Sequence, residues 1–369
     1  MIGSVMSWGM FIALMLIALC FVVIFFILQM EKMCWVKNIK NKYVRHAVSL
    51  IPVAIIGLLF IWSFSNCTAI VGHLFVILLI GKFIYYIVKK ITKKDYKYGF
   101  EITIIVSTIF TAMYLGYAFY VAHNVVETHY DVVTKKDLGV DSFRIVQISD
   151  SHIGSLINGD KFKKYMEDIN KTNPDIVVVT GDFIDDGTSY SDMVKACEGL
   201  GLLKTKYGVY FVYGNHDMPY YENTLDSYTH LEEELKKNNV TILQDEGKDI
   251  VGNIYLYGRK DKRSAVRKSA QEIMSEIDKN KYVIVLNHQP NDYDNESKSQ
   301  MDLVLSGHTH GGQFFPLQIV EMFGTNDSVY GKTVRDNTTF IVTSGIADWE
   351  VHFKTGTVAE YVVIDIKKN

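Results

Sequence analysis

Long apolar stretches with very few charged residues dominate the first third of the chain. Each is long enough, or nearly so, to cross a bilayer as a helix, for which about 20 residues suffice. The pattern therefore predicts an N-terminal bundle of four transmembrane helices within a transmembrane domain of residues 1–123. The expected spans are residues 8–30, 47–64, 68–88 and 100–122.

A few residues in these stretches have a second interpretation. The first stretch, Trp8 to Met30, resembles a cleaved signal peptide in its apolarity, but no charged segment precedes it and no small-residue cleavage site stands out. Pro52 falls in the first turns of its helix, where proline is tolerated. Lys82 is near a charged end and can extend its ammonium group to the interface. His73 is better interpreted as a hydrogen-bonding partner between helices than as a proton carrier or metal ligand.

Basic residues are concentrated between the predicted spans. Up to His123 the chain has eleven Lys or Arg and three acidic residues, a net charge of +8, and since the whole chain carries −3, the remainder carries −11. Apart from Lys82, the basic residues lie between the first and second spans and between the third and fourth, whereas the loop 65–67 is uncharged. Because positively charged loops stay in the cytoplasm, we expect a multi-pass protein of the cell membrane whose domain after His123 is extracytoplasmic.

The rest of the chain alternates short apolar runs with helical patterns, which is typical of an α/β domain. We expect a linker over residues 124–138 and the domain over residues 139–369. The expected strands are residues 143–149, 175–180, 209–212, 254–258, 282–286, 303–306, 338–344 and 360–366, and the expected helices are 161–170, 191–203, 230–238 and 264–277. This order suggests two sheets packed face to face and flanked by helices. Only Cys197 of the four cysteines lies in this domain, so it holds no internal disulfide.

Five of the expected strands end in residues that bind hard or borderline metals. The sequence Tyr-Gly-Asn-His-Asp at 213–217 follows one apolar strand, at the end where open α/β sheets keep their active sites. The other endings are Asp150-Ser151-His152, Gly181-Asp182, Asn287-His288 and Gly307-His308-Thr309-His310. Carboxylate, amide and imidazole groups suit Mn, Fe, Zn, Co or Ni, and the lack of Cys among them excludes a thiolate zinc finger. The pattern favours a catalytic metal site over a structural one.

Taken in order, these blocks resemble the signature of the calcineurin-like metallophosphoesterase superfamily over residues 143–313. The Gly311-Gly312-Gln313 that follows is similar to the tail of its bacterial membrane-anchored members. The resemblance implies a four-layer α/β/β/α sandwich. It also implies two divalent metal ions, drawn from Mn, Fe, Zn, Co and Ni.

The resemblance also implies a role for each residue of the signature. Asp182 would bridge the two metals. Asp150, His152 and His310 would complete one metal site, and Asn215, His288 and His308 the other. His216 would remain beside the site as the donor of a proton to the leaving oxygen, with Asp217 orienting or charging it. Asn215 and His216 would contact the substrate.

Two further acidic residues follow the second block. Asp185 and Asp186 would either add a metal ligand or lie in an exposed loop, and the exposed loop is the favoured interpretation. Gly181, Gly214 and Gly307 would let the backbone approach the metals or the phosphate closely.

Two cations a few Å apart can hold both oxygens of a phosphoryl transfer and lower the pKa of a bridging water. We therefore expect a metal-dependent phosphoric ester hydrolase, a phosphodiesterase or pyrophosphatase that works by attack of metal-activated hydroxide. Its acidic outer domain argues against a nucleic-acid polymer. Membrane anchoring leaves three substrate classes open: a lipid head group, an envelope intermediate that is lipid-linked, and a nucleotide.

Two alternatives come from other classes of protein. One is a catalytically weak membrane sensor or scaffold that binds phosphate ligands without turnover. The other is a transporter built on the four spans, which the small number of ionisable residues within them disfavours.

Overall fold

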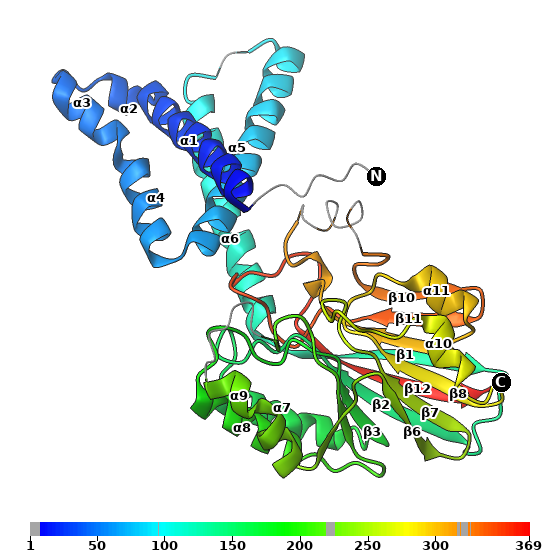
Figure 1. The fold of residues 1–369 in the computed structure, drawn as a ribbon. Coiled ribbons are helices and arrows are strands. Elements are labelled where there is room, and N and C mark those ends of the chain that lie inside the picture. The colour runs from blue at the N-terminus through cyan, green and yellow to red at the C-terminus, as the bar shows by residue number, and fades with distance from the viewer. Residues whose placement is uncertain (1–7, 95, 219–225, 316–317, 319–323, 325) are drawn as a thin grey trace. The chain divides into compact units, whose positions relative to one another are not determined.

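The computed structural model describes residues 8–369 except 95, 219–225, 316–317, 319–323 and 325, and gives only the backbone of residues 8–16, 18 and 226 (Figure 1). The chain divides into two compact units, Met1–Ala118 and Phe119–Asn369. Each unit has its own core, and they are described separately below.

The first unit is helical. Its helices are α1 (Trp8–Lys32), α2 (Cys34–Lys37), α3 (Lys42–Ser49), α4 (Ile51–Trp62), α5 (Phe64–Thr92) and the larger part of α6 (Gly99–His123). Within the described residues, three helical segments are long and apolar enough to cross a membrane: Lys42–Trp62, Phe64–Thr92 and Gly99–His123. These correspond to the last three expected spans. The first expected span is helical as α1, but the side chains of residues 8–16 and 18 lie outside the described residues, so a fourth span stays a prediction.

Three residues interrupt the apolar pattern, and two of them have hydrogen-bond partners. Pro52 is in the first turn of α4. Leu50 lies between the end of α3 and the start of α4. The His73 ring hydrogen-bonds through Nδ1 to Ala69 O of its own helix at 2.6 Å. Lys82 donates to Gln29 Oε1. The His73 ring also lies 5.7 Å, centroid to centroid, from that of Tyr114 in α6, so it contacts a neighbouring helix as well as its own.

The second unit contains two six-stranded mixed sheets. Strands of the first sheet lie in the order β1-β12-β2-β3-β4-β5. Their bounds are β1 (Val126–Thr134), β2 (Ser142–Ile148), β3 (Ile176–Val179), β4 (Val209–Phe211), β5 (Val240–Ile242) and β12 (Glu360–Lys368). Strands β2 to β5 run parallel to one another, and β12 is antiparallel to β2.

Strands of the second sheet lie in the order β10-β11-β9-β8-β7-β6. Their bounds are β6 (Glu246–Val251), β7 (Ile254–Gly258), β8 (Tyr282–Leu286), β9 (Leu303–Ser306), β10 (Gly331–Arg335) and β11 (Thr338–Val342). The four central strands are parallel, and β6 and β10 are antiparallel at the two edges. Because both sheets have a parallel centre, each collects several strand ends at one edge.

Apolar side chains on opposite faces of the same strand enter different cores. Ile145 and Val178 of the first sheet and Ile284 and Leu305 of the second belong to one core cluster, made of residues from both sheets. Their strand neighbours Val146 and Val179 join a cluster with the helices that follow β2, β3 and β4. The corresponding residues of the second sheet, such as Val285, pack with its two short helices. Strands buried on both faces read as continuous apolar runs, which is why most of them could be predicted.

Among the described residues, five α-helices connect the strands: α7 (Gly159–Lys171), α8 (Tyr190–Gly201), α9 (Asp226–Lys237), α10 (Ala270–Ser275) and α11 (Tyr293–Lys298) (Figure 1). Asn158, Ser189 and Ser269 cap α7, α8 and α10 by accepting backbone N–H groups. Such caps satisfy donors that have no partner in the first helical turn.

The expected helix over residues 264–277 was wrong at its beginning. Ser269 and Glu272 form a capping box that starts α10 at Ala270, and Val266, which we expected on its apolar face, is 75% exposed. A capping box fixes the first turn of a helix. The residues before it form an irregular loop after β7.

Most of the stretch expected to be a linker forms strand β1. Val126 to Thr134 pair in parallel with Glu360 to Lys368 of β12. Only Val132 of this strand is buried, so its polar and partly exposed sequence gave no apolar run.

Candidate metal centre

The residues expected to bind metal all follow the carboxyl ends of parallel strands. Asp150 and His152 follow β2, Asp182 follows β3, Asn215 follows β4, His288 follows β8, and His308 and His310 follow β9. The structure brings them together because these strands belong to the parallel centres of the two sheets. Such an edge is where open α/β folds hold their ligands.

The first cluster consists of Asp150, His152 and His310. One ligand atom from each lies within 4.8 Å of the others, and all three residues are buried. The two Nε2 atoms of the histidines are 3.2 Å apart, and His310 Nε2 is 3.8 Å from Asp150 Oδ1. Asp150 is held by the backbone N–H of His308, which donates to its carboxylate at 2.9 Å.

The second cluster consists of Asp182, His288 and His308, again with ligand atoms within 4.8 Å of one another. His288 Nε2 is 3.0 Å from Asp182 Oδ2 and 3.2 Å from Asn215 Oδ1. Asn215 therefore lies beside this cluster.

Asp182 faces both clusters. Its Oδ2 atom, which is 3.0 Å from His288 Nε2 in the second cluster, is also 3.9 Å from His152 Nε2 in the first. Its Oδ1 atom accepts the backbone N–H of His216 at 2.7 Å. A single carboxylate thus lies between the two groups of imidazoles.

In His152, His288 and His310, the Nδ1 atom has an oxygen atom beside it. His152 Nδ1 is 3.3 Å from Asp185 Oδ2, and His310 Nδ1 is 3.3 Å from Asp348 Oδ1. His288 Nδ1 contacts the carbonyl oxygen of Thr180 at 2.7 Å. Histidines that bind metals commonly donate this nitrogen to a carboxylate or carbonyl, which turns the free nitrogen toward the ion. The chemistry of the donor set therefore fits two divalent cations.

Asp185 does not lie in an exposed loop, the interpretation that the sequence favoured. Its side chain is buried beside His152, and its Oδ1 atom accepts the backbone N–H of Gly187 at 2.8 Å. Asp186 instead accepts the hydroxyl of Tyr228 at 2.9 Å.

Five of the residues in the two clusters have left-handed backbone conformations. These are Asp150, His152, Asp182, His308 and His310, with φ values of 53°, 38°, 51°, 74° and 49°. Such values are uncommon outside glycine, and strained backbone of this kind gathers at functional sites. The turns after β2, β3 and β9 are therefore shaped by what their side chains must reach.

Two glycines permit close packing at the same edge. A Cβ atom on Gly214 would lie 2.2 Å from Asp182 Oδ1, and one on Gly307 would lie 2.3 Å from Asp150 Oδ2. These positions accept no side chain without displacing a carboxylate of the site.

His216 lies beside the first cluster. Its ring centroid is 5.1 Å from that of His152 on one side and 5.1 Å from that of Trp349 on the other. Burial lowers the pKa of His216, and the nearby Asp182 carboxylate offsets part of that effect. The ring is therefore held next to the candidate metal site.

Asp217 connects two of the turns that carry the site. Its Oδ1 atom accepts the backbone N–H groups of Phe183 and Ile184 at 2.8 and 3.0 Å, and Oδ2 accepts that of Gly214 at 2.8 Å. Burial and the charge of Asp182 raise the pKa of Asp217 to about 7. Its contacts fasten the turn after β4 to the segment after β3.

In the second cluster, the charges favour one positive charge among the two histidines. Burial alone would lower the pKa of His288, but the Asp182 carboxylate outweighs it and raises that pKa to about 10. Burial and the neighbouring His288 lower the pKa of His308 to about 4. Burial opposes the ionisation of Asp182, yet the surrounding histidines hold its pKa well below the usual range. A cation at this place would supply the charge that a proton on His288 otherwise provides.

Sequence reasoning missed several residues around the centre. Asp348 and Lys354 lie in the irregular segment between β11 and β12, and Trp349 is next to them. Arg263, in the loop after β7, donates through Nη1 to Asn215 O. The run of six basic residues in 259–268 was a visible signal for the loop after β7, whereas the segment before β12 has no distinctive pattern.

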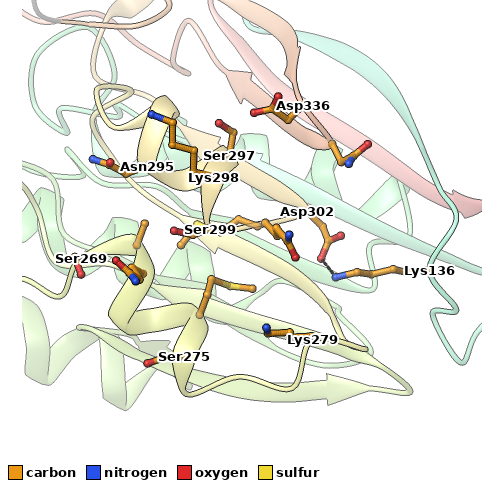
Figure 2. Close-up of a pocket in the computed structure, with 16 residues that line it drawn as sticks. Lys136, Ser269, Ser275, Lys279, Asn295, Ser297, Lys298, Ser299, Asp302 and Asp336 are labelled. Carbon is orange, nitrogen blue, oxygen red and sulfur yellow. Dashed lines mark hydrogen bonds and ion pairs between the residues drawn. The ribbon is translucent and has the colours of Figure 1, made fainter.

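A hollow of about 1040 Å³ lies at the opposite ends of the second sheet's strands (Figure 2). Lys279 and Asp302, which line it, precede β8 and β9, whereas the metal cluster follows those strands. Lys136 reaches Asp302 there, with Nζ 2.7 Å from Oδ2. This hollow is therefore separate from the candidate metal centre.

The site thus consists of two clusters of imidazole and carboxylate groups with Asp182 between them, a donor set that suits divalent cations. The family model for the calcineurin-like phosphoesterases matches residues 143–312, the segment that carries every residue of both clusters. The chain belongs to the calcineurin-like phosphoesterase family.

Known relatives agree with this assignment. An uncharacterised metallophosphoesterase of Aquifex aeolicus is 31% identical over 56% of this chain and 78% of its own length. One from Campylobacter jejuni is 30% identical over 63% of this chain and 60% of its own length. A transmembrane protein with a metallophosphoesterase domain from Danio rerio is 28% identical over 64% of this chain and 56% of its own length. The chain thus spans less than two thirds of the last two relatives.

Proposed function

We propose that this protein is a membrane-anchored phosphoesterase with two metal ions, and that it hydrolyses a phosphodiester or a pyrophosphate. The observation that carries the proposal is the position of Asp182 Oδ2, 3.0 Å from His288 Nε2 and 3.9 Å from His152 Nε2. A carboxylate shared between two sets of imidazoles is what a pair of cations needs to stay close together.

In this proposal Asp182 bridges the two ions. Asp150, His152 and His310 hold one ion, and Asn215, His288 and His308 hold the other. Mn, Fe, Zn, Co and Ni all suit this mixture of oxygen and nitrogen donors. Bound there, the two ions would polarise the phosphoryl group and supply a nucleophile at neutral pH.

The chain's own residues supply binding and proton transfer. The His216 ring lies 5.1 Å from that of His152, beside the first cluster. We assign it the donation of a proton to the leaving oxygen, a contribution typically of about 100- to 10,000-fold. The Asn215 amide and the His216 ring together contact the phosphate.

For Asp217 we propose the orienting role expected from the sequence, exerted through the backbone. Its two oxygens accept three backbone N–H groups of the turns after β3 and β4. We therefore assign it the positioning of those turns, and through them of Asp182, Asn215 and His216.

The membrane part is proposed to have four spans, with a domain boundary near His123 and the catalytic domain of residues 139–369 outside the cytoplasm. The basic loops support this orientation, and the helix α1 supports the first span. The catalytic domain is proposed to be a four-layer α/β/β/α sandwich. The three core clusters, which pair sheet with sheet and each sheet with helices, support it.

For the substrate we propose an envelope phosphate ester, such as a lipid head group, a lipid-linked intermediate or an extracellular nucleotide. Anchoring in the membrane supports the first two, because both substrate and enzyme would be held at one surface. The net charge of −11 after His123 disfavours a nucleic-acid polymer.

The experiment is hydrolysis of a bis-aryl phosphate by the purified full-length chain in detergent, with Mn, Fe, Zn or no added metal. Metal-dependent turnover that is lost in His308→Ala would support the proposal. A folded chain that binds metal but hydrolyses neither this ester nor an aryl pyrophosphate would instead support a sensor that binds phosphate without turnover.

A further inference from the structure

Outside the two clusters, the segment between β11 and β12 holds a buried ion pair with no part in the mechanism above. The side chains of Lys354 and Asp348 are both 0% exposed, and Lys354 Nζ lies 2.6 Å from Asp348 Oδ1. Lys354 Nζ also donates to Ser344 O at 2.7 Å. Lysine is almost never fully buried unless it is paired, so this pair needs an explanation.

The pair extends to a candidate metal ligand. Asp348 Oδ1, the atom that meets Lys354, is also 3.3 Å from His310 Nδ1. The Ala347 carbonyl lies 3.3 Å from the same nitrogen. Lys354, Asp348 and His310 therefore form a row that ends at the first cluster, where His310 Nε2 faces His152 Nε2 at 3.2 Å.

The segment that carries Asp348 is fixed to the rest of the site. Ile346 N donates to Ser149 O at 2.9 Å, next to Asp150 at the end of β2. A Cβ atom on Gly345, whose φ is +83°, would lie 2.9 Å from the Cβ of Asp150. Asp348 thus has a defined place relative to both Asp150 and His310.

A buried pair of this kind contributes little to stability for its own sake. Removing two charges from water costs about as much as their attraction returns, and apolar residues of similar volume often serve equally well. A buried charged pair is better explained where one member has a second partner that needs the charge. His310 is that partner here.

Resting on the two-metal function proposed above, we propose that Asp348 and Lys354 are positioning residues for His310. Asp348 Oδ1 and the Ala347 carbonyl, each 3.3 Å from His310 Nδ1, accept its N–H between them, which leaves the lone pair of Nε2 facing the first metal site. Lys354 balances the negative charge of Asp348 in the interior and links its carboxylate to the Ser344 carbonyl, with one bond to each.

Asp185, the carboxylate beside His152, provides a comparison. Asp185 is 3.3 Å from His152 Nδ1, but it is held by the backbone N–H of Gly187 and not by a buried lysine in the part of the chain that the structure describes. His152 and His310 are therefore each oriented by a carboxylate, and the two carboxylates are held in different ways. Lys354 acts on only one of them.

The test measures metal binding by the full-length chain in detergent, with Mn²⁺ as the probe, for Lys354→Met, Lys354→Arg and the double variant Asp348→Asn with Lys354→Met. The double variant removes both charges and so leaves no uncompensated buried charge. It keeps the test usable if the single variant fails to fold. Lys136→Met, which breaks the ion pair with Asp302 beside the hollow of Figure 2, is the matched control.

We expect the wild type to bind two Mn²⁺ ions. Lys354→Met and the double variant should bind one as tightly as the wild type and the other about 10- to 100-fold more weakly, the usual effect of losing such an outer partner. Lys354→Arg should restore most of the lost affinity, and kcat should fall in parallel with occupancy while KM changes little. Lys136→Met should change thermal stability only.

Two results would overturn the assignment. If the double variant binds both ions as tightly as the wild type, the pair is merely structural. If Lys354→Arg is as impaired as Lys354→Met, the positive charge is not what matters. Failure of the proposed function is distinguishable, because the wild type itself would then bind no pair of ions or would bind them without turnover.

Discussion

The Nε2 atoms of His152 and His310 face each other at 3.2 Å, although the two residues are 158 positions apart in the sequence. Two imidazole nitrogens on one metal ion, each bonded at about 2.0–2.1 Å in tetrahedral geometry, lie at a similar separation from each other. The turns after β2 and β9 thus hold two rings at the spacing that one shared cation requires.

This relationship predicts the effect of removing one ring. His310→Ala should lose one metal ion per chain and keep the other, because His288, His308 and Asp182 form a separate cluster. Metal content of the purified full-length variant, measured by mass spectrometry, checks this. Loss of both ions together, in a variant that melts at the wild-type temperature, would show that the clusters are not separate sites.

Removal of the His216 ring should affect chemistry and not metal binding. His216→Ala keeps the backbone N–H that bonds to Asp182 Oδ1, so both ions should remain. The rate should fall by about 100- to 10,000-fold for esters with poor leaving groups, which need a proton, and much less for 4-nitrophenolate. An equal loss across a series of leaving groups would argue against His216 as the proton donor.

Gly214 offers a test that deletes no ligand. A Cβ atom there would lie 2.2 Å from Asp182 Oδ1 and 2.4 Å from Asp182 N, so Gly214→Ala should displace the carboxylate that both clusters share. A shift of about 1 Å in such a group can cost about 100-fold in rate. Gly116→Ala is the control, since its new Cβ atom would have nothing within 4 Å. Full activity and full metal content in Gly214→Ala would contradict the described packing.

The proposed orientation in the membrane predicts the outcome of proteolysis. Protease added to intact cells should digest the chain after His123, because the basic loops are expected in the cytoplasm. An antibody against the C-terminal residues would follow the digestion by immunoblot, with a cytoplasmic protein as the control for cell integrity. A protected domain would mean that the topology is inverted.

The central strands of the fold could be predicted because each is a continuous run of apolar residues. Strands β7, β8 and β9 begin and end where the apolar runs do. The edge strands could not be predicted in this way. Strand β6, for example, reads Glu-Gly-Lys-Asp-Ile-Val with no buried residue, so its pairing with β7 and not its own pattern makes it a strand.

The candidate site was predictable where it follows a strand and not elsewhere. His288 and His308 come directly after apolar runs, and parallel strands bring such ends together. Asp348 and Lys354 lie in an irregular segment, and only the folded chain shows that they reach His310. The sequence favoured an exposed loop for Asp185, yet its side chain is buried against His152.

The most direct test of a binuclear phosphoesterase is the metal content of the full-length chain beside that of Asp182→Asn, with hydrolysis of a bis-aryl phosphate measured on the same samples. The account predicts two ions and metal-dependent turnover for the wild type, and loss of both bound metal and activity for a folded Asp182→Asn. Two ions retained in Asp182→Asn would contradict a bridging role for this residue. A wild type with a full metal complement and no turnover on any phosphate ester would contradict the enzyme itself.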